Sequence, residues 1–419
     1  SFHTPQTAGD NTNYYVYFTV NELSPPTAPS SSLTVGNPSY TAATTFVTSA
    51  TPITLATTST NDVGFQYRFH RDGVPLPTFS SSPFPVHWTT TDFAVGPRMV
   101  PLFLNANDGA DGDYAVQYSA QTADGVNEPR NTNRLTLDNT PPVATIAQPT
   151  ATQYGHSSPL MLNYSVSDGS GSGVKSFTPK MDGQTAMQFG ASLDSGQTIY
   201  LYSMSLGTHT FSVDSVDNVN NAGTNSVTFT ITVTPDSLKG DVTDLAGLGC
   251  IDNISQSLIA KISAAQNLIS KGQTQAAINT LAALIHEVQA QAGKHISTAC
   301  KDPSGRSFDP VQLLLEDARY LQASVAGQLA ANPVLGWVVN FSGAGIGGVT
   351  VNLMSSSATV IATATTDATG FYYFATSALT AGANYTLGVT LPTAYTSATP
   401  ASLTFTWSAS SVVGNFALN

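Results

Sequence analysis

Residues 227–233 read VTFTITV. Apolar side chains alternate with threonines at every position, and a two-residue period places all the apolar groups on one face of an extended chain. The same pattern returns along most of the sequence between turn residues, as in YAVQYSA at 114–120, MLNYSV at 161–166 and HTFSV at 209–213. We therefore predict a mostly β protein built from sandwiches.

The composition indicates a folded protein and argues against nucleic acid as its partner. The chain has 419 residues, a formal charge of -12 and only 10% charged residues, against roughly 25% in an average soluble domain. Its 41% hydrophobic content is enough for packed cores, so a disordered polar chain is excluded. With 14 basic against 26 acidic residues, nucleic acid is not an expected partner. No apolar run approaches the roughly 18 residues of a membrane span.

An internal repeat marks the first domain boundaries. Residues 131–142 read NTNRLTLDNTPP, and residues 11–26 read NTNYYVYFTVNELSPP. Each ends in a proline pair, which stiffens a connection between domains. We therefore expect β-sandwiches at 24–140 and 141–234, and we expect residues 1–23 to be the closing hairpin of a preceding domain of the same type.

The second sandwich resembles the Ig-like repeats common in large secreted bacterial proteins. The resemblance rests on Ser167-Asp168 before a Gly/Ser turn, on Met181-Asp182-Gly183, and on the run from Val213-Asp214 to Asp217-Asn218. It implies tandem Ig-like β-sandwiches. Neither of the two sandwiches contains a cysteine, so the inter-sheet disulfide of many Ig domains is absent from this sequence.

The hydrophobic period changes from two to about 3.6 near residue 250. Apolar residues recur on one helical face over 254–269 and again over 278–292, with Lys271-Gly272 between them. A third helix is expected from Asp309-Pro310, an N-cap followed by proline at the first helical position. These patterns predict a small α-helical domain at 239–331.

The helical region also carries a family resemblance. Residues 257–297 read SLIAKISAAQNLISKGQTQAAINTLAALIHEVQAQAGKHIS and closely resemble the FIMAH domain, a small helical module of extracellular multidomain proteins. The resemblance implies an extracellular setting and lends the chain no biochemical activity.

Cys250 and Cys300, the two cysteines of the chain, bracket this helical segment. A disulfide between them would stabilise the fold by roughly 4 kcal/mol in the chain-entropy model, because it restricts the unfolded chain. It would also indicate an oxidising, extracellular compartment. Two separate reduced thiols are the alternative, since no histidine or third cysteine stands nearby at a metal-ligand spacing.

Residues 336–419 resemble the prealbumin-like fold of Cna B-type and carboxypeptidase regulatory-like domains. The motifs are GIGGVTVNL at 345–353, TTDATG before FYYF at 365–374, and NFAL at 415–418. Many Cna B-type domains form a Lys–Asn isopeptide bond, but no Lys or Arg follows Arg319 here. Beyond Arg319 the only charged side chain is Asp367, so little charge repulsion opposes association of this domain.

Four residues are candidate Ca²⁺ ligands at one end of the second sandwich. Ca²⁺ takes six to eight oxygen ligands, and loops rich in Asp and Asn supply them. The alternative is a turn role, because the same residues bond their local backbone in turns. No other cofactor is expected. The candidates are Asp168, Asp214, Asp217 and Asn218.

Two features bear on sugars. Asn163, Asn253 and Asn384 stand in N-x-S/T sequons and are candidate glycosylation sites. Trp88, Trp337 and Trp407 could stack on a bound glycan, but tryptophans fill the cores of β-sandwiches as well.

Residues 14–20 form a strand candidate that is apolar on both faces. Such a strand suits a buried sheet position and would be a liability if exposed. We therefore expect it to complete a sheet, in its own chain or by strand addition to a neighbouring subunit. Its members are Tyr14, Tyr15, Val16, Tyr17, Phe18, Thr19 and Val20.

The sequence offers no catalytic motif. His286-Glu287 lacks the second zinc-binding histidine, because position 290 is Ala290, and no G-x-S-x-G nucleophile elbow is present. We expect an extracellular or cell-surface protein with a structural or adhesive role, such as a filament or stalk subunit. Its expected partners are copies of itself, another surface protein or a glycan. The alternative is a non-catalytic accessory region of a larger secreted hydrolase.

Overall fold

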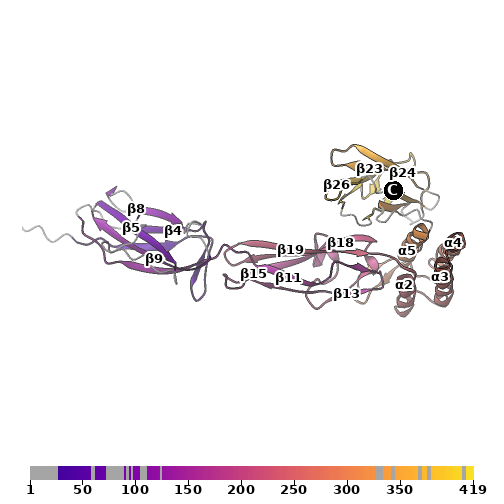
Figure 1. The fold of residues 1–419 in the computed structure, drawn as a ribbon, viewed down its shortest axis with the longest axis horizontal. Coiled ribbons are helices and arrows are strands. Elements are labelled where there is room, and N and C mark those ends of the chain that lie inside the picture. Colours follow the sequence, from indigo (N-terminus) through magenta and orange to yellow (C-terminus); the bar gives the residue numbers. More distant parts are fainter. Residues whose placement is uncertain are drawn as a thin grey trace, which may run out of the picture. The chain divides into compact units, whose positions relative to one another are not determined.

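The computed structural model confirms the mostly β fold and divides into two compact units (Figure 1). Unit 1 comprises residues up to Pro141 with the loops Asp168–Gly173 and Asp217–Asn221, and unit 2 comprises the remainder. The expected strand at 14–20, Trp88 and Asp367 lie outside the described residues. The structure describes residues 27–57, 62–71, 89–90, 94–95, 98–103, 111–122, 125–325, 334–340, 345–366, 370–374, 379–407 and 412–419.

Unit 1 is built from two sheets. One has the strand order β1-β4-β8 and the other β2-β3-β10-β9-β5-β6, with β7 paired to β5. Among the described strands of this unit, the pairings are antiparallel except that of β3 with β10. The strands are β1 (Ser31–Val35), β2 (Ser39–Thr41), β3 (Thr45–Val47), β4 (Pro52–Thr57), β5 (Asp62–Arg71), β6 (Thr89–Thr90), β7 (Ala94–Val95), β8 (Arg98–Phe103), β9 (Gly112–Thr122) and β10 (Asn131–Leu137).

The core of unit 1 follows from the alternation of its strands. In β4 every second side chain is buried, so Ile53 and Leu55 face inward. They belong to one cluster with Phe65 of β5 and with Tyr114 and Val116 of β9. The two-residue period therefore places the apolar face of each sheet on the shared core.

Unit 2 begins with the second sandwich. Strand β18 pairs with β19 along nearly its whole length, β12 lies parallel to β19, and β11 pairs with β14. The stretch VTFTITV supplies most of the second half of β19, with Phe229 and Ile231 buried. The elements are β11 (Val143–Gln148), β12 (Gln153–Tyr154), β13 (Pro159–Met161), β14 (Asn163–Ser167), β15 (Val174–Met181), β16 (Gln184–Thr185), α1 (Ala186–Phe189), β17 (Thr198–Tyr200), η1 (Leu201–Ser203), β18 (Gly207–Asp217) and β19 (Ala222–Ile231).

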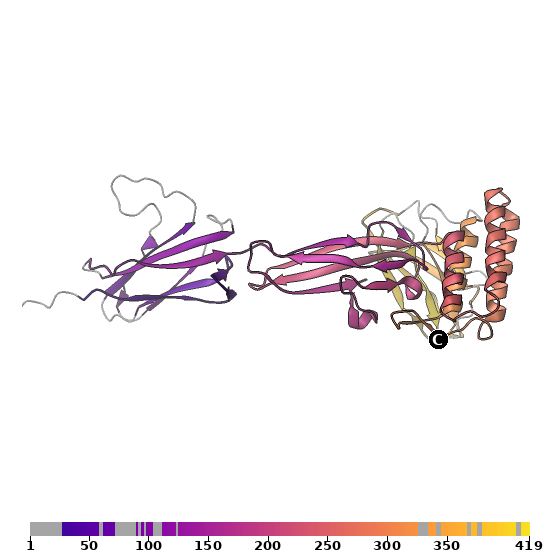
Figure 2. The same ribbon diagram turned by 90° about the horizontal axis from the view of Figure 1, so that it is seen from below.

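The helical part of unit 2 starts earlier than the change of period near residue 250. Helix α2 begins at Pro235, where Thr234 and Ser237 form a reciprocal capping box. Helices α3 and α4 lie side by side (Figure 2), joined through Gly272 with a φ of +67°, and α5 begins at Pro310, as predicted. The elements are α2 (Pro235–Gly247), α3 (Ser255–Ser270), α4 (Thr274–Gln291), β20 (Cys300–Lys301), β21 (Ser307–Phe308) and α5 (Pro310–Val325).

A disulfide links the two ends of this helical segment. Cys250, just after α2, is bonded to Cys300 in β20, with 6.0 Å between their Cα atoms. Ile251 and Ile296 lie beside it as an isolated bridge between extended segments.

One hydrophobic core runs through the second sandwich and the helices. It includes Phe211 and Phe229 of the sandwich and Leu281 of α4, and it reaches Trp337 of the C-terminal sandwich. The rings of Tyr202 and Phe308 stack 5.2 Å apart where the two parts meet. The helices are therefore packed onto the sandwich by buried apolar contacts within unit 2.

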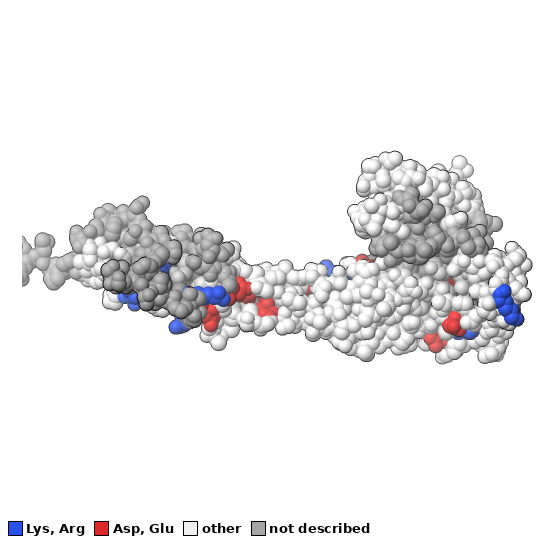
Figure 3. Space-filling view, viewed as in Figure 1, with Lys and Arg blue, Asp and Glu red and all other residues white. Residues whose placement is uncertain are grey.

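The C-terminal sandwich completes unit 2. One sheet has the order β24-β23-β26-β28, and β22 pairs with β25, β29 and β30 in the other. On the face seen in Figure 3 its described atoms carry no acidic or basic side chain. The strands are β22 (Val334–Asn340), β23 (Thr350–Ser355), β24 (Val360–Thr365), β25 (Phe371–Phe374), β26 (Asn384–Val389), β27 (Ala398–Thr399), β28 (Ser402–Thr406), β29 (Val412–Val413) and β30 (Phe416–Leu418).

Candidate metal centre

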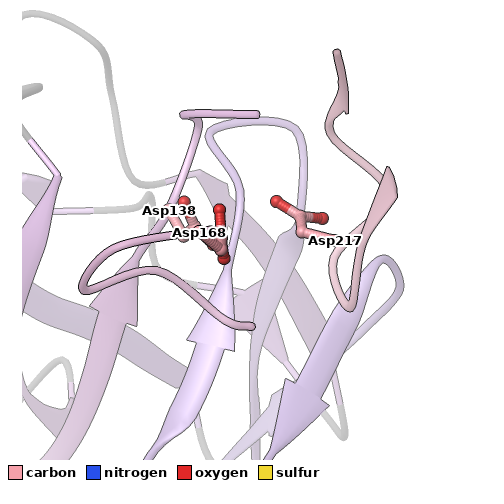
Figure 4. Close-up of side chains that lie close together, drawn as sticks. All are labelled: Asp138, Asp168 and Asp217. Carbon is pink, nitrogen blue, oxygen red and sulfur yellow. The ribbon is translucent and has the colours of Figure 1, made fainter. Parts of the chain in front are cut away.

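Three carboxylates from three separate segments meet in unit 1. Asp138 directly follows β10, Asp168 directly follows β14, and Asp217 is the last residue of β18. One carboxylate oxygen of each lies within 4.8 Å of one oxygen of each of the others. Figure 4 shows the three side chains gathered at the strand ends. We call this group the Asp138 cluster.

Backbone and amide groups hold the Asp217 carboxylate and the main chain of Asp138 in place. Asp217 Oδ1 accepts hydrogen bonds from the backbone N–H groups of Val219 and Asn221, at 2.9 and 2.8 Å. The amide Nδ2 of Asn221 donates both to Asp217 Oδ2, at 2.7 Å, and to the main-chain oxygen of Asp138, at 3.0 Å. Asn221 therefore ties the loop after β18 to the end of β10.

The loop that starts at Asp168 is fixed to the same point. The backbone N–H of Ser172 donates to Asp138 Oδ2, and that of Gly173 donates to Asp168 Oδ2, both at 2.7 Å. A Cβ atom added at Gly171 would collide with Asp168 and would lie 2.9 Å from Asp138 Oδ2. Only glycine lets this loop approach the carboxylates so closely.

The Asp138 cluster concentrates negative charge away from water. Asp138 and Asp217 are 1% and 0% exposed, and Asp168 Oδ1 is buried without a hydrogen-bond partner. Burial raises the pKa of Asp168, and the neighbouring carboxylates of Asp138, Asp217 and Asp111 raise it further. Within the described ranges, no lysine or arginine forms an ion pair with the three cluster carboxylates. A cation would supply the missing positive charge.

The structure brings together two of the four predicted ligands. Asp168 and Asp217 are in the cluster, whereas Asp214 lies outside it and binds Lys180 Nζ at 2.6 Å and Thr224 Oγ1 at 2.8 Å. Asn218 directs its Nδ2 to the backbone oxygens of Ser172 and Gly173, both at 2.9 Å. Its amide group therefore clamps the neighbouring loop.

The alternation of β18 explains why Asp214 and Asp217 separate. Buried and half-buried residues alternate along this strand, and Phe211, Val213 and Asp217 fall on the buried face. Asp214 falls on the other face, because it is an odd number of residues away. The same period was visible in the sequence and could have distinguished the two carboxylates.

Asp138 was not among the predicted ligands, because it lies in the segment LDNTPP, whose proline pair is typical of a linker between sandwiches. Its neighbour Asp111, from the acidic run at 108–113, accepts from the backbone N–H of Asn139 at 2.9 Å. Asp113 accepts from Thr136 Oγ1 at 2.7 Å. These two acidic residues thus fasten the end of β10.

The remaining candidates lie apart from the Asp138 cluster. The three sequon asparagines, Asn163, Asn253 and Asn384, are exposed, and their glycosylation stays a prediction. Trp337 and Trp407 are 3% and 4% exposed, so both rings are core residues and neither forms an open stacking platform.

Comparison with known families places the C-terminal sandwich. Residues 338–409 match the SdrD B-like domain, which supports the predicted Cna B-type, prealbumin-like fold there. No curated protein matches the chain. The FIMAH resemblance of the helical segment stays a prediction.

No helix within the described residues combines the length and the apolar character that a membrane crossing requires.

Solved structures with similarity to the chain include several modular proteins. Fibronectin(III)-like modules of Clostridium thermocellum CbhA are 15% identical with a TM-score of 0.23, over 48% of this chain and 94% of that one. A 1.5-MDa bacterial ice-binding adhesin is 12% identical with a TM-score of 0.27, over 94% and 97% of the two chains. A Ca²⁺-stabilized adhesin of an Antarctic bacterium is 12% identical with a TM-score of 0.23, over 88% and 71%. TM-scores this low do not establish a common fold, so these matches carry no argument about function.

Proposed function

We propose that the chain is an extracellular structural or adhesive segment whose unit 1 binds Ca²⁺ at the Asp138 cluster. The observation that carries the proposal is the meeting of three carboxylates, two of them fully buried, with no basic side chain paired to them among the described residues. Buried, mutually repelling carboxylates are costly unless a proton or a cation neutralises them.

The donor set favours Ca²⁺ over other metals. All three side chains offer hard oxygen ligands, which suit Ca²⁺ and Mg²⁺ and not the thiolate and imidazole preferences of zinc. The three side chains come from different segments, and Ca²⁺ accepts irregular sets of six to eight oxygens, whereas Mg²⁺ demands near-octahedral geometry. Backbone oxygens and water would complete the shell.

A bound Ca²⁺ would make the attachment of two loops depend on the ion. The loops Asp168–Gly173 and Asp217–Asn221 each contribute one carboxylate, and Asp138 contributes the third. Ligand binding to the folded state stabilises it by about 2.7 kcal/mol when the free ion is at 100 times the dissociation constant. Extracellular Ca²⁺ modules bind with dissociation constants of about 10⁻⁴ to 10⁻³ M, which fits a surface protein.

Calorimetric titration of the chelator-treated chain with Ca²⁺ tests the site. We expect Asp217→Asn, Asp168→Asn and Gly171→Ala each to weaken binding at least tenfold, the first two by removing charge and the third by filling the approach to the carboxylates. Asp214→Asn is the matched control, because this carboxylate binds Lys180 and is expected to leave the affinity unchanged. Absence of binding at 10 mM Ca²⁺, or an equal loss in Asp214→Asn, would refute the proposal.

Three features support the extracellular role. The C-terminal sandwich matches the SdrD B-like domain, a disulfide closes the helical segment, and the region beyond Arg319 carries one charged residue. Disulfides persist in oxidising compartments. A surface nearly without charge has little electrostatic repulsion against association with other proteins or with copies of itself.

The finer assembly mode is also a proposal. We infer from its apolar character on both faces that the strand at residues 14–20 adds to a sheet of a neighbouring subunit. Electron microscopy of the native assembly and of a variant lacking residues 1–22 tests this step. Unchanged assemblies in the variant would count against it.

A further inference from the structure

A cavity of about 550 Å³ opens between α5 and the C-terminal sandwich inside unit 2. Its volume lies in the range of small-molecule sites. The cavity does not share a residue with the Asp138 cluster, so any ligand it takes is independent of Ca²⁺.

One wall of the cavity is a polar stripe of α5. Gln312, Glu316 and Arg319 line it, and their spacing of four and three residues places them on one face of the helix. The stripe therefore presents an amide, a carboxylate and a guanidinium side by side.

The opposite side is a small apolar floor on the sheet. Val339 of β22 and Ala417 of β30 are direct register partners, and both line the cavity. Trp337 stands two residues before Val339, on the same face of β22. Trp337 is 3% exposed, and its ring packs 5.3 Å from that of Phe371, so the floor is backed by packed aromatic side chains.

The polar groups around the cavity are held before any ligand arrives. Asn415 Oδ1 accepts from the backbone N–H of Trp337 at 3.0 Å, and the Asn415 side chain also hydrogen-bonds Glu316. Asp309 Oδ1 accepts from the backbone N–H groups of Val311 and Gln312, at 2.8 and 3.3 Å, which caps α5 at the edge of the cavity. Fixed donors and acceptors lower the entropy cost of binding.

We propose that this cavity binds a short, uncharged saccharide. A sugar ring has an apolar C–H face that fits the floor formed by Val339 and Ala417, and hydroxyl groups that can donate to Glu316 and accept from Arg319. A wholly apolar ligand would offer no polar partner to the amide, carboxylate and guanidinium groups that line the wall. The cavity lining has two carboxyl groups, those of Asp309 and Glu316, and one guanidinium, that of Arg319, and this balance of charge disfavours an anionic ligand.

Saturation-transfer NMR and thermal unfolding of the full chain test the proposal. The probes are D-glucose, D-galactose, N-acetyl-D-glucosamine and cellobiose at millimolar concentration. At least one probe is expected to receive saturation and to raise the unfolding temperature of unit 2. Ala417→Leu, which fills the floor, and Gln312→Ala, which shortens the wall, are each expected to weaken its binding at least tenfold. Gln275→Ala, on the exposed face of α4, is the matched control.

Three results would overturn the saccharide assignment. The first is no response to any of the four probes, and the second is unchanged binding in both cavity variants. The third is binding of a free amino acid or a dipeptide in place of the sugars, since the Glu316 and Arg319 pair could also hold a zwitterion. Circular dichroism separates loss of binding from loss of folding, and Gln312→Ala on the helix surface serves if Ala417→Leu does not fold. Chelation of Ca²⁺ is expected to leave the sugar response unchanged.

Discussion

His156 is a buried charged residue that joins the second sandwich to α5 within unit 2. It lies in the loop between β12 and β13 and is 2% exposed. Its Nδ1 is 2.9 Å from Asp317 Oδ1, and its Nε2 is 2.8 Å from the main-chain oxygen of Met204. Both partners are acceptors, so both ring nitrogens carry a proton and the imidazole is positively charged.

The acidic groups that face His156 set its pKa. Burial alone would lower the pKa, but Asp317 outweighs it, together with Glu316 of the same helix and Asp241 of α2, and raises the pKa to about 9. For the carboxyl group of Asp241, burial acts in the opposite direction and raises the pKa well above its usual value. The charge of Asp317 raises the pKa of Asp241 further. His156 and Asp241 therefore hold their protons more tightly in the folded protein than in the unfolded chain.

We predict that unit 2 loses stability as the pH rises above 6.5. A raised histidine pKa contributes stability that is fully present below the unfolded value, near 6.5, and is lost as the pH passes through about 9. The loss is up to about 3 kcal/mol in the free energy of unfolding. Urea unfolding at pH 6, 7.5 and 9 measures it.

The control variants make this prediction specific. His156→Gln is expected to destabilise unit 2 at every pH and to flatten the pH dependence, because it leaves buried carboxylates without their cation. His286→Gln, at an exposed position of α4, is expected to change neither. A wild-type chain whose stability does not change between pH 6 and pH 9 would contradict the role given to His156.

At the scale of elements, the helical segment depends on its disulfide. Cys250 and Cys300 are 50 residues apart in sequence, and Cys250 is buried beside the core. The double variant Cys250→Ala with Cys300→Ala is expected to lower the free energy of unfolding of unit 2 by roughly 4 kcal/mol, because the unfolded chain regains the entropy of a long loop. Urea denaturation measures the loss.

Reduction provides an independent check on the disulfide prediction. The wild-type chain in excess reductant is expected to match the double variant, and reductant should not affect the variant itself. A loss below 1 kcal/mol in both experiments would show that the helices are held by core packing alone.

Helix α2 shows how an element escapes a periodicity argument. Its buried residues Leu238, Val242 and Leu245 have helical spacing, but aspartates, threonine and glycine separate them. The clearer signal lies at its start, where Thr234, Pro235 and Ser237 form the capping box and the first turn. The capping box and Pro235 therefore mark this helix in the sequence more clearly than its hydrophobic period does.

At the scale of the whole molecule, the structure predicts at least two unfolding transitions. The core around Leu55 and Phe65 belongs to unit 1, and the core that includes Leu281 belongs to unit 2. Scanning calorimetry of Leu55→Ala is expected to lower only the unit 1 transition, by about 2–5 kcal/mol for a buried leucine. Leu281→Ala is the matched reciprocal variant and is expected to lower only the unit 2 transition. One transition that moves with either substitution would contradict this independence.

Local patterns in the chain were enough to predict many of the strands, the helical hairpin, α5 and the nearly uncharged C-terminal sandwich. Strand and helix periods are local properties of a short window, so VTFTITV and the repeats around Ile262 and Leu281 could be interpreted without any knowledge of distant residues. The near absence of charge beyond Arg319 is likewise a property of the chain alone.

Which polar side chains come into contact depends on the folding of distant segments onto one another. Asp138, Asp168 and Asp217 come together because the ends of three strands and their loops converge. His156 meets Asp317 through the packing of a loop on a helix. Contacts of this kind depend on sheet register and on the packing of distant segments. The hydrophobic period of a short stretch of sequence does not specify either of them. The Asp138 cluster and the cavity beside α5 therefore depend on packing, whereas the sandwiches follow from the sequence.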